Sequence, residues 1–180
     1  MQEPAPPSGG PTKDEIMAIS LQKLGLREGD IFADIGCGTG KISLCAAPGV
    51  KKVFAIDRRE EAVRYARGDA AKQGITNIEF FSGEAARVLP GLFPIDAAFV
   101  GGSRDLEQTL EILVRGGVRS VVVNAVMIET MYLAIKTMQR LGIFSEALSV
   151  QVSRSAAIGN GVMFRPIDPV FIIVGGEQGC

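Results

Sequence analysis

The stretch from Ile31 to Gly40 most constrains the fold of this chain. It reads Ile-Phe-Ala-Asp-Ile-Gly-Cys-Gly-Thr-Gly, a mostly apolar run that contains one acid, Asp34, and ends in three glycines at alternate positions. The apolar run predicts a buried strand. The glycines permit a sharp turn and the close approach of a ligand, and the helical pattern after them offers free N–H groups. Strand, turn and helix together predict the first unit of a nucleotide-binding α/β domain.

The spacing of the glycines distinguishes between classes of nucleotide-binding domain. The dinucleotide fingerprint is G-x-G-x-x-G, whereas the glycines here are Gly36, Gly38 and Gly40, and Lys41 holds the third fingerprint position. A lysine there would crowd the close helix–strand packing that a glycine permits. The pattern from Asp34 onward instead resembles the first motif of Rossmann-like methyltransferases that depend on S-adenosylmethionine (SAM). A tight turn without a ligand is the alternative interpretation, which the later segments disfavour.

Composition indicates one globular domain and excludes several chemistries. The 180 residues are 47% hydrophobic and 22% charged, which suits a single domain with a real core. We predict a flexible N-terminal arm over residues 1–10, which are rich in Pro and Gly, and one domain over residues 11–180. The chain has no histidine, so Ser-His-Asp triads and histidine-ligated zinc or haem are impossible. Any acid or base must be another side chain, a water or the substrate itself.

Charge and cysteine usage predict the surroundings of the protein. The net charge of −1 does not indicate nucleic-acid binding. The first ten residues lack the regions of a signal peptide, and no apolar run approaches the roughly 20 residues of a membrane span. The cysteines Cys37, Cys45 and Cys180 are odd in number and lack metal-ligand spacing. We therefore expect a cytoplasmic protein without a nucleic-acid partner, a membrane partner or a protein-bound metal.

Strand and helix patterns alternate along the rest of the chain. The first helix is predicted to begin with a capping box, in which Thr12 is the N-cap and Glu15 lies three residues on. Further strands are predicted over 53–57, 78–82, 96–100, 119–124, 144–153 and 170–174, and helices over 41–47, 60–73, 105–114 and 126–141. Residues 154–168 are expected to be a loop or hairpin tip. This order predicts a seven-stranded, mostly parallel sheet with a C-terminal antiparallel hairpin and helices on both faces, an ending typical of methyltransferases rather than dehydrogenases.

Candidate ligand-binding residues follow the carboxyl ends of the predicted strands, where α/β sheets bind their ligands. Asp57 ends the second strand, and an acid at this place can accept hydrogen bonds from two ribose hydroxyls. A surface acid that caps the next helix is the alternative. Residues 83–85 follow the third strand and residues 101–103 the fourth. The two glycines of the latter leave room for a substrate, although Ser103 also suits a helix N-cap.

From Gly10 onward the chain resembles the decarboxylating cobalt-precorrin methyltransferases that act on carbon 15 in anaerobic cobalamin biosynthesis. The segments that carry the resemblance are residues 10–12, 34–40, 55–58, 83–85, 100–103 and 129–130. The glycine turn is generic to methyltransferases, and the specific features are the G-P-T start, the I-D-R strand end and the V-G-G-S turn together. Glu84 departs from the family pattern, which has Asp there, and lengthens that side chain by one methylene.

The resemblance implies a class I SAM-dependent methyltransferase with SAM as its co-substrate. It implies a SAM site formed by Thr12, Asp34, Gly36, Cys37, Gly38, Thr39, Gly40, Asp57, Glu84 and Ala85, in which Asp57 holds the ribose and Ala85 borders the adenine. The candidates for binding the tetrapyrrole are Gly101, Gly102, Ser103, Arg104 and Arg154, with Arg165 as a further cation for its carboxylates. No catalytic residue is assigned, and Glu129 and Ser103 are the candidates. The resemblance also implies a homotetramer, with residues 154–168 as our candidate assembly segment, and functional pairing with a separate carbon 5 methyltransferase.

Three functions stay open. The favoured one is methylation of carbon 15 of cobalt-precorrin-6B coupled to decarboxylation of its ring C acetate. The second is methylation of RNA or protein on the same fold, which the near-neutral charge and the lack of a basic or aromatic RNA surface disfavour. The third is an NADP-binding oxidoreductase or a non-catalytic nucleotide-binding protein. Arg58 and Arg59, which follow Asp57, suit a 2′-phosphate, whereas Lys41 and the closing hairpin disfavour this reading.

Overall fold

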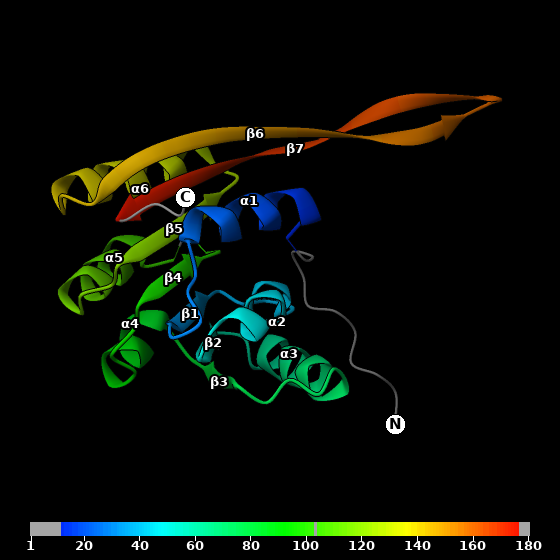
Figure 1. Cartoon of the computed structure of the whole chain (residues 1–180). Helices are drawn as coiled ribbons and strands as arrows, with labels where there is room; N and C mark the ends of the chain where they lie inside the picture. The colour runs from blue at the N-terminus through cyan, green and yellow to red at the C-terminus, as the bar shows by residue number, and fades with distance from the viewer. Residues whose placement is uncertain (1–11, 103, 177–180) are drawn as a thin grey trace.

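The computed structural model describes residues 12–102 and 104–176, which form one sheet covered by helices on both faces (Figure 1). The strands are β1 (Ile31–Ile35), β2 (Lys52–Asp57), β3 (Ile78–Ser82), β4 (Ala97–Val100), β5 (Ser120–Ala125), β6 (Phe144–Ile158) and β7 (Gly161–Gly176). The helices are α1 (Asp14–Leu24), α2 (Lys41–Ala46), α3 (Glu60–Lys72), α4 (Ala85–Val88), α5 (Leu106–Arg115) and α6 (Ile128–Arg140), with short 3₁₀ turns η1 (Ala47–Gly49) and η2 (Leu89–Gly91). No helix within these residues is long and apolar enough to cross a membrane.

The sheet has the order β3-β2-β1-β4-β5-β7-β6. The first five strands in this order are parallel, and β7 runs antiparallel to both of its neighbours. The predicted seven-stranded sheet with a C-terminal antiparallel hairpin is therefore confirmed. The order reverses between β1 and β4, and ligands of such sheets bind outside the carboxyl ends of the strands at this reversal.

Alternation along the central strands fills a core on each face of the sheet. In β1, Phe32 packs into the core beneath α1, α2 and α3, whereas Ala33 and Ile35 pack into the core beneath α5 and α6. In β5, Val122 and Val123 alternate in the same way. Because both faces are buried, the strands read as continuous apolar runs. This burial holds the strand ends, and the turns that follow them, in fixed positions.

The predicted capping box at the start of α1 is wrong. The N-cap is Lys13, and no side chain caps the helix. Glu15 of the expected box pairs with Arg154 instead, and the backbone carbonyl of Thr12 accepts a hydrogen bond from Lys41 Nζ at 2.7 Å. Lys41 also pairs with Asp14. Instead of crowding the packing, this lysine joins the first turns of α1 and α2.

Of the two structures expected for residues 154–168, a loop or a hairpin tip, the structure has the hairpin tip. Strand β6 continues to Ile158 and β7 starts at Gly161, so that the two strands pair throughout this segment, and Figure 1 shows them as a long arm that extends beyond the helices. Arg154 faces Arg165 across the pair. The Gly, Pro and polar residues here suggested a loop because most of the arm is exposed and only Ala156, Met163 and Ile167 are half-buried, so the usual inward–outward alternation is weak. The predicted flexible segment 1–10 lies outside the described residues.

Candidate functional site

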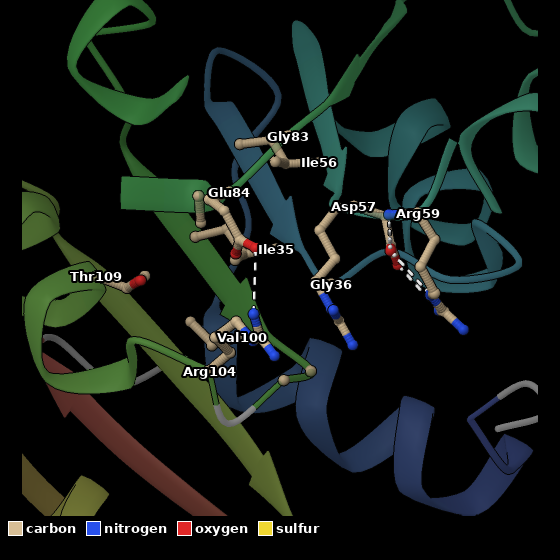
Figure 2. Close-up of a pocket in the computed structure, with 14 residues that line it drawn as sticks. Ile35, Gly36, Ile56, Asp57, Arg59, Gly83, Glu84, Val100, Arg104 and Thr109 are labelled. Carbon is tan, nitrogen blue, oxygen red and sulfur yellow. Dashed lines mark hydrogen bonds and ion pairs between the residues drawn. The ribbon is translucent and has the colours of Figure 1, made fainter. Parts of the chain in front are cut away.

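A cavity of about 460 Å³ opens at the carboxyl ends of β1, β2, β3 and β4 (Figure 2). This volume lies within the range of roughly 300–1,000 Å³ that is typical of small-molecule sites. Four of the predicted cofactor residues line the cavity, namely Gly36, Asp57, Glu84 and Ala85, and so do three of the predicted substrate residues, Gly101, Gly102 and Arg104. The rest of the lining is Ile35, Ile56, Arg58, Arg59, Gly83, Val100 and Thr109.

Backbone hydrogen bonds fix the glycine turn between β1 and α2. The N–H groups of Gly36 and Cys37 both donate to the carbonyl of Ile56, at 2.8 and 3.0 Å. Gly40 has a left-handed conformation with φ of 79°, and a Cβ there would lie only 2.7 Å from the Cβ of Ala66. The close packing that a dinucleotide fingerprint gives to its third glycine therefore occurs one residue earlier here, at Gly40.

Cys37 and Thr39, two predicted cofactor residues within this turn, do not line the cavity. Cys37 is buried, and its burial raises the pKa of the thiol, so this side chain stays neutral. Thr39 instead lines a separate surface depression with Lys41, Cys45 and Tyr65. Both residues belong to the turn that joins β1 to α2.

Asp34 lies beneath the turn rather than in the cavity. Its side chain is fully buried, and Oδ2 accepts hydrogen bonds from the backbone N–H and the hydroxyl of Ser43 in α2. Its Oδ1 has no hydrogen-bond partner within the described residues. Burial raises the pKa of Asp34 from 3.8 to about 6, and the two bonds from Ser43 offset this only in part. The acid thus anchors the start of α2 against β1.

Asp57, at the end of β2, is the buried acid that faces the cavity. Its Oδ2 accepts the Gly38 N–H at 2.9 Å, and its Oδ1 accepts the Arg59 N–H at 3.0 Å. The guanidinium of Arg59 donates to both oxygens, from Nε at 3.1 Å and from Nη2 at 3.1 Å. Burial would raise the pKa of Asp57, but the hydrogen bonds from Arg59 and Gly38 outweigh it and lower that pKa. Asp57 is therefore an ionised, buried acceptor and not a surface cap.

Two charged side chains face each other across the cavity mouth. Glu84 is the N-cap of α4, and its carboxylate lies 3.6 Å from Arg104, which follows β4 (Figure 2). The Arg104 side chain is 61% exposed, so this pair is worth little to stability. It can open readily to let either group contact a ligand.

Several predicted site residues lie outside the cavity lining. Arg154 donates both Nε and Nη2 to the carboxylate of Glu15, and this ion pair ties β6 to α1. Glu129 is exposed in the first turn of α6. Thr12 contacts Lys41 through its carbonyl, as described above. Ser103 lies outside the described residues, and the N-cap of α5 is Asp105.

Sequence reasoning missed the roles of two polar residues of the cavity wall. It gave Arg59 only a possible role at a 2′-phosphate, although the guanidinium turns back onto Asp57. It gave Thr109 no role, although this residue of α5 lines the cavity and its buried hydroxyl has no partner among the described residues. The available signal was a polar residue within the apolar stripe of α5, one position before the buried Leu110.

Comparison with known proteins identifies the family of this chain. Residues 7–175 match the family model of the precorrin methyltransferase domain. A probable cobalt-precorrin-6B C(15)-methyltransferase (decarboxylating) from Methanosarcina acetivorans is 47% identical over 183 aligned positions, which cover 99% of this chain and 100% of the relative.

Two solved structures extend the similarity to the fold. The precorrin 8W decarboxylase from Methanobacterium thermoautotrophicum superposes with a TM-score of 0.88 at 30% identity, covering 98% of this chain and 96% of its own. The precorrin-6y C5,15-methyltransferase from Geobacter metallireducens superposes with a TM-score of 0.89 at 27% identity, covering 96% and 94%. The family expected from the sequence motifs is thereby confirmed, and the chain belongs to the precorrin methyltransferase family.

Proposed function

We propose that this chain transfers a methyl group from SAM to carbon 15 of cobalt-precorrin-6B and releases carbon dioxide from the ring C acetate. The observation that carries the proposal is the cavity where the ionised carboxylate of Asp57 and the two-glycine turn after β4 lie at the same edge of the sheet. A relative that is 47% identical is named for this reaction. The family implies SAM as the methyl donor.

The residues of the cavity fit the nucleoside part of SAM. Asp57 supplies a buried carboxylate, an acceptor suited to two ribose hydroxyls. Gly36 follows β1 and has no side chain, which lets a ligand lie close to the backbone. Ala85 and Glu84, at the start of α4, border the position we assign to the adenine. Gly101 and Gly102 leave the space beside this position open for the carbon that receives the methyl group.

The chain contributes mainly position and exclusion of water to the methyl transfer. The sulfonium of SAM already activates the methyl group, because its carbon–sulfur bond breaks readily as the new carbon–carbon bond forms. Holding donor and acceptor in line supplies roughly 7–11 kcal/mol of the barrier in favourable cases. No strong protein base is needed, which agrees with a chain that has no histidine.

The electron pair released by decarboxylation replaces the pair that the macrocycle gives up in the methylation. The new bond to the methyl group takes an electron pair from the macrocycle, and the bond to carbon dioxide returns a pair when it breaks. The macrocycle holds these electrons, as electron-sink cofactors do in other enzymes. The task left to the protein is to fix the acetate and keep its surroundings dry. An ion pair with the carboxylate of the ring C acetate would stabilise that group before the reaction. A cation such as Arg104 therefore suits the carboxylates that stay on the ring.

We further propose that the arm formed by the ends of β6 and β7 assembles four copies of the chain. Its apolar side chains Ile158, Val162 and Phe164 are 56%, 73% and 71% exposed. Such a group of exposed apolar residues favours burial against another protein surface. Arg154 and Arg165 lie on this arm, and assembly is the route by which they would approach a neighbouring site. We also propose a cytoplasmic location and functional pairing with a separate carbon 5 methyltransferase.

Mass spectrometry of cobalt-precorrin-6B incubated with the protein and SAM tests the reaction directly. The expected product has gained one methyl group and lost one carbon dioxide, and S-adenosylhomocysteine (SAH) accumulates in equal amount. Omission of SAM is the control for spontaneous decarboxylation. Calorimetry with SAM and with NADPH tests the alternative oxidoreductase, and binding of NADPH alone would reject the methyltransferase proposal.

A further inference from the structure

The carboxylate of Asp57 already accepts four hydrogen bonds from the protein. Two come from backbone N–H groups, of Gly38 to Oδ2 and of Arg59 to Oδ1. Two come from the Arg59 guanidinium, from Nε to Oδ1 and from Nη2 to Oδ2 (Figure 2). A carboxylate offers about four lone-pair directions. The acceptor capacity of Asp57 is therefore filled by the chain itself.

A ribose that binds through both of its hydroxyls needs two of these acceptor positions. The backbone donors are held by the fold, since Gly38 belongs to the glycine turn and the Arg59 carbonyl accepts the first hydrogen bonds of α3, from Ala62 and Val63. The guanidinium is the donor that side-chain rotation alone can withdraw. It is also the more accessible partner, because the Arg59 side chain is 28% exposed and that of Asp57 only 4%.

We propose that the Arg59 guanidinium and the ribose of the co-substrate compete for Asp57, and that Arg59 thereby sets the affinity of the site for SAM. This inference rests on the proposed function, which places the ribose at Asp57. Binding then exchanges two charge-assisted bonds from Arg59 for two bonds from hydroxyls. SAM and SAH carry the same ribose, so the competition weakens both and shortens the residence of the product, a step that limits many enzymes. Arg59 is a positioning residue that acts through Asp57.

Loss of the Arg59 side chain should therefore tighten the binding of SAM and SAH. In Arg59→Leu, the buried carboxylate keeps its two backbone donors and has two acceptor positions open for the ribose. Electrostatics provides a competing explanation, because removal of a positive charge favours a cationic ligand. Arg58 allows a matched control, since it lines the same cavity but provides none of the four bonds to Asp57.

Isothermal calorimetry with SAH tests the exchange, because SAH lacks the sulfonium charge. We expect Arg59→Leu to bind SAH roughly tenfold more tightly than the unaltered chain, the equivalent of about one net hydrogen bond. Arg58→Leu should bind within about twofold of the unaltered chain, a difference small against that tenfold change. The 2′-deoxy analogue of SAH adds a readout that a merely structural role would not change. Its loss of affinity relative to SAH should be larger in Arg59→Leu, because the hydroxyl no longer has to displace the guanidinium.

Three outcomes would overturn the exchange. Weaker binding by Arg59→Leu would mean that Arg59 contacts the ligand directly, unchanged binding would mean that it never leaves Asp57, and equal tightening in Arg58→Leu would mean a general charge effect. If Arg59→Leu does not fold, Arg59→Lys keeps the charge but not the two-pronged donor, and intermediate tightening is expected. Failure of the unaltered chain to bind SAH at all would instead reject the proposed function.

Discussion

Ser43 donates both its backbone N–H and its hydroxyl to one carboxylate oxygen of Asp34, in the layer between β1 and α2. This contact fixes the helix that follows the glycine turn. It also leaves an acid in the core whose pKa burial raises from 3.8 to about 6. A buried acid of this kind makes the stability of the fold depend on pH.

Asp34→Asn should therefore remove a pH dependence that the unaltered chain shows. Between pH 4 and 6 the folded state holds the proton of Asp34 more firmly than the unfolded state, so the free energy of unfolding falls as pH rises. The difference between the pKa of 3.8 and the raised pKa of about 6 corresponds to roughly 3 kcal/mol, and this stabilisation is lost as pH rises above 6. Urea unfolding at pH 4, 5, 6 and 7 measures this slope, and an equal slope in Asp34→Asn would refute the assignment to Asp34.

Asp57→Ala should weaken SAM binding at least tenfold, about 1.4 kcal/mol, because the bound ribose hydroxyls would be left without their charged acceptor. The fold should persist, as judged by circular dichroism. Asp57→Asn is the matched variant, since its amide keeps the shape and one acceptor oxygen and should have an intermediate effect. Calorimetry gives both affinities, and an unchanged SAM affinity in Asp57→Ala would exclude a ribose at this carboxylate.

Gly38→Val should abolish SAM binding in a protein that still folds. Gly38 has φ of 55°, and the nearest atom to an added Cβ is Arg59 Nη2 at 3.8 Å, so the protein itself leaves room for a side chain that would obstruct the ligand. A left-handed conformation is strained for valine by about 1–2 kcal/mol. Gly74→Val is the matched control, because φ there is 68° and an added Cβ meets nothing within 4 Å. If both variants bind SAM equally well, the glycine turn has only a structural role.

The sequence predicted those parts of the fold and site in which local pattern and burial agree. Apolar strands followed by glycines or acids predicted the sheet and the lining residues Gly36, Asp57 and Gly101, because strand ends meet at one edge of a parallel sheet. The C-terminal hairpin was predicted because the last strands follow the final helix without a further crossover. These inferences need no knowledge of side-chain partners.

Other features were missed because they depend on partners that are distant in the chain or compete for the same group. The motif of Thr12 and Glu15 predicted a helix cap, but Arg154, 139 residues from Glu15, takes up the carboxylate. The sequence suggested a ligand phosphate as the partner of Arg59, whereas its guanidinium pairs with Asp57, a contact that only the geometry identifies. The arm lacked a burial pattern because most of its residues are exposed.

Phe164→Ser should dissociate the assembled protein, if the arm holds the copies together as proposed. Phe164 is 71% exposed in the single chain, so the substitution should leave the fold of the chain intact. Tyr132→Ser is the control, because Tyr132 is an exposed aromatic residue of α6 away from the arm. Sedimentation at several protein concentrations measures the mass of the particle. A tetramer that survives Phe164→Ser would reject the arm as the assembly contact.

Glu129→Gln tests whether the decarboxylation needs a protein acid or base. Glu129 is exposed in the first turn of α6 and does not line the cavity, and the macrocycle itself can hold the electron pair. We expect Glu129→Gln to retain carbon dioxide release within about a hundredfold of the unaltered chain, the low end of a typical acid–base contribution. Release of labelled carbon dioxide under saturating SAM is measured together with methyl transfer, which reports whether the substrate still binds productively. A larger loss of decarboxylation with intact methyl transfer would make Glu129 a proton-transfer group, and would place the chemistry of this step on the protein rather than on the ring.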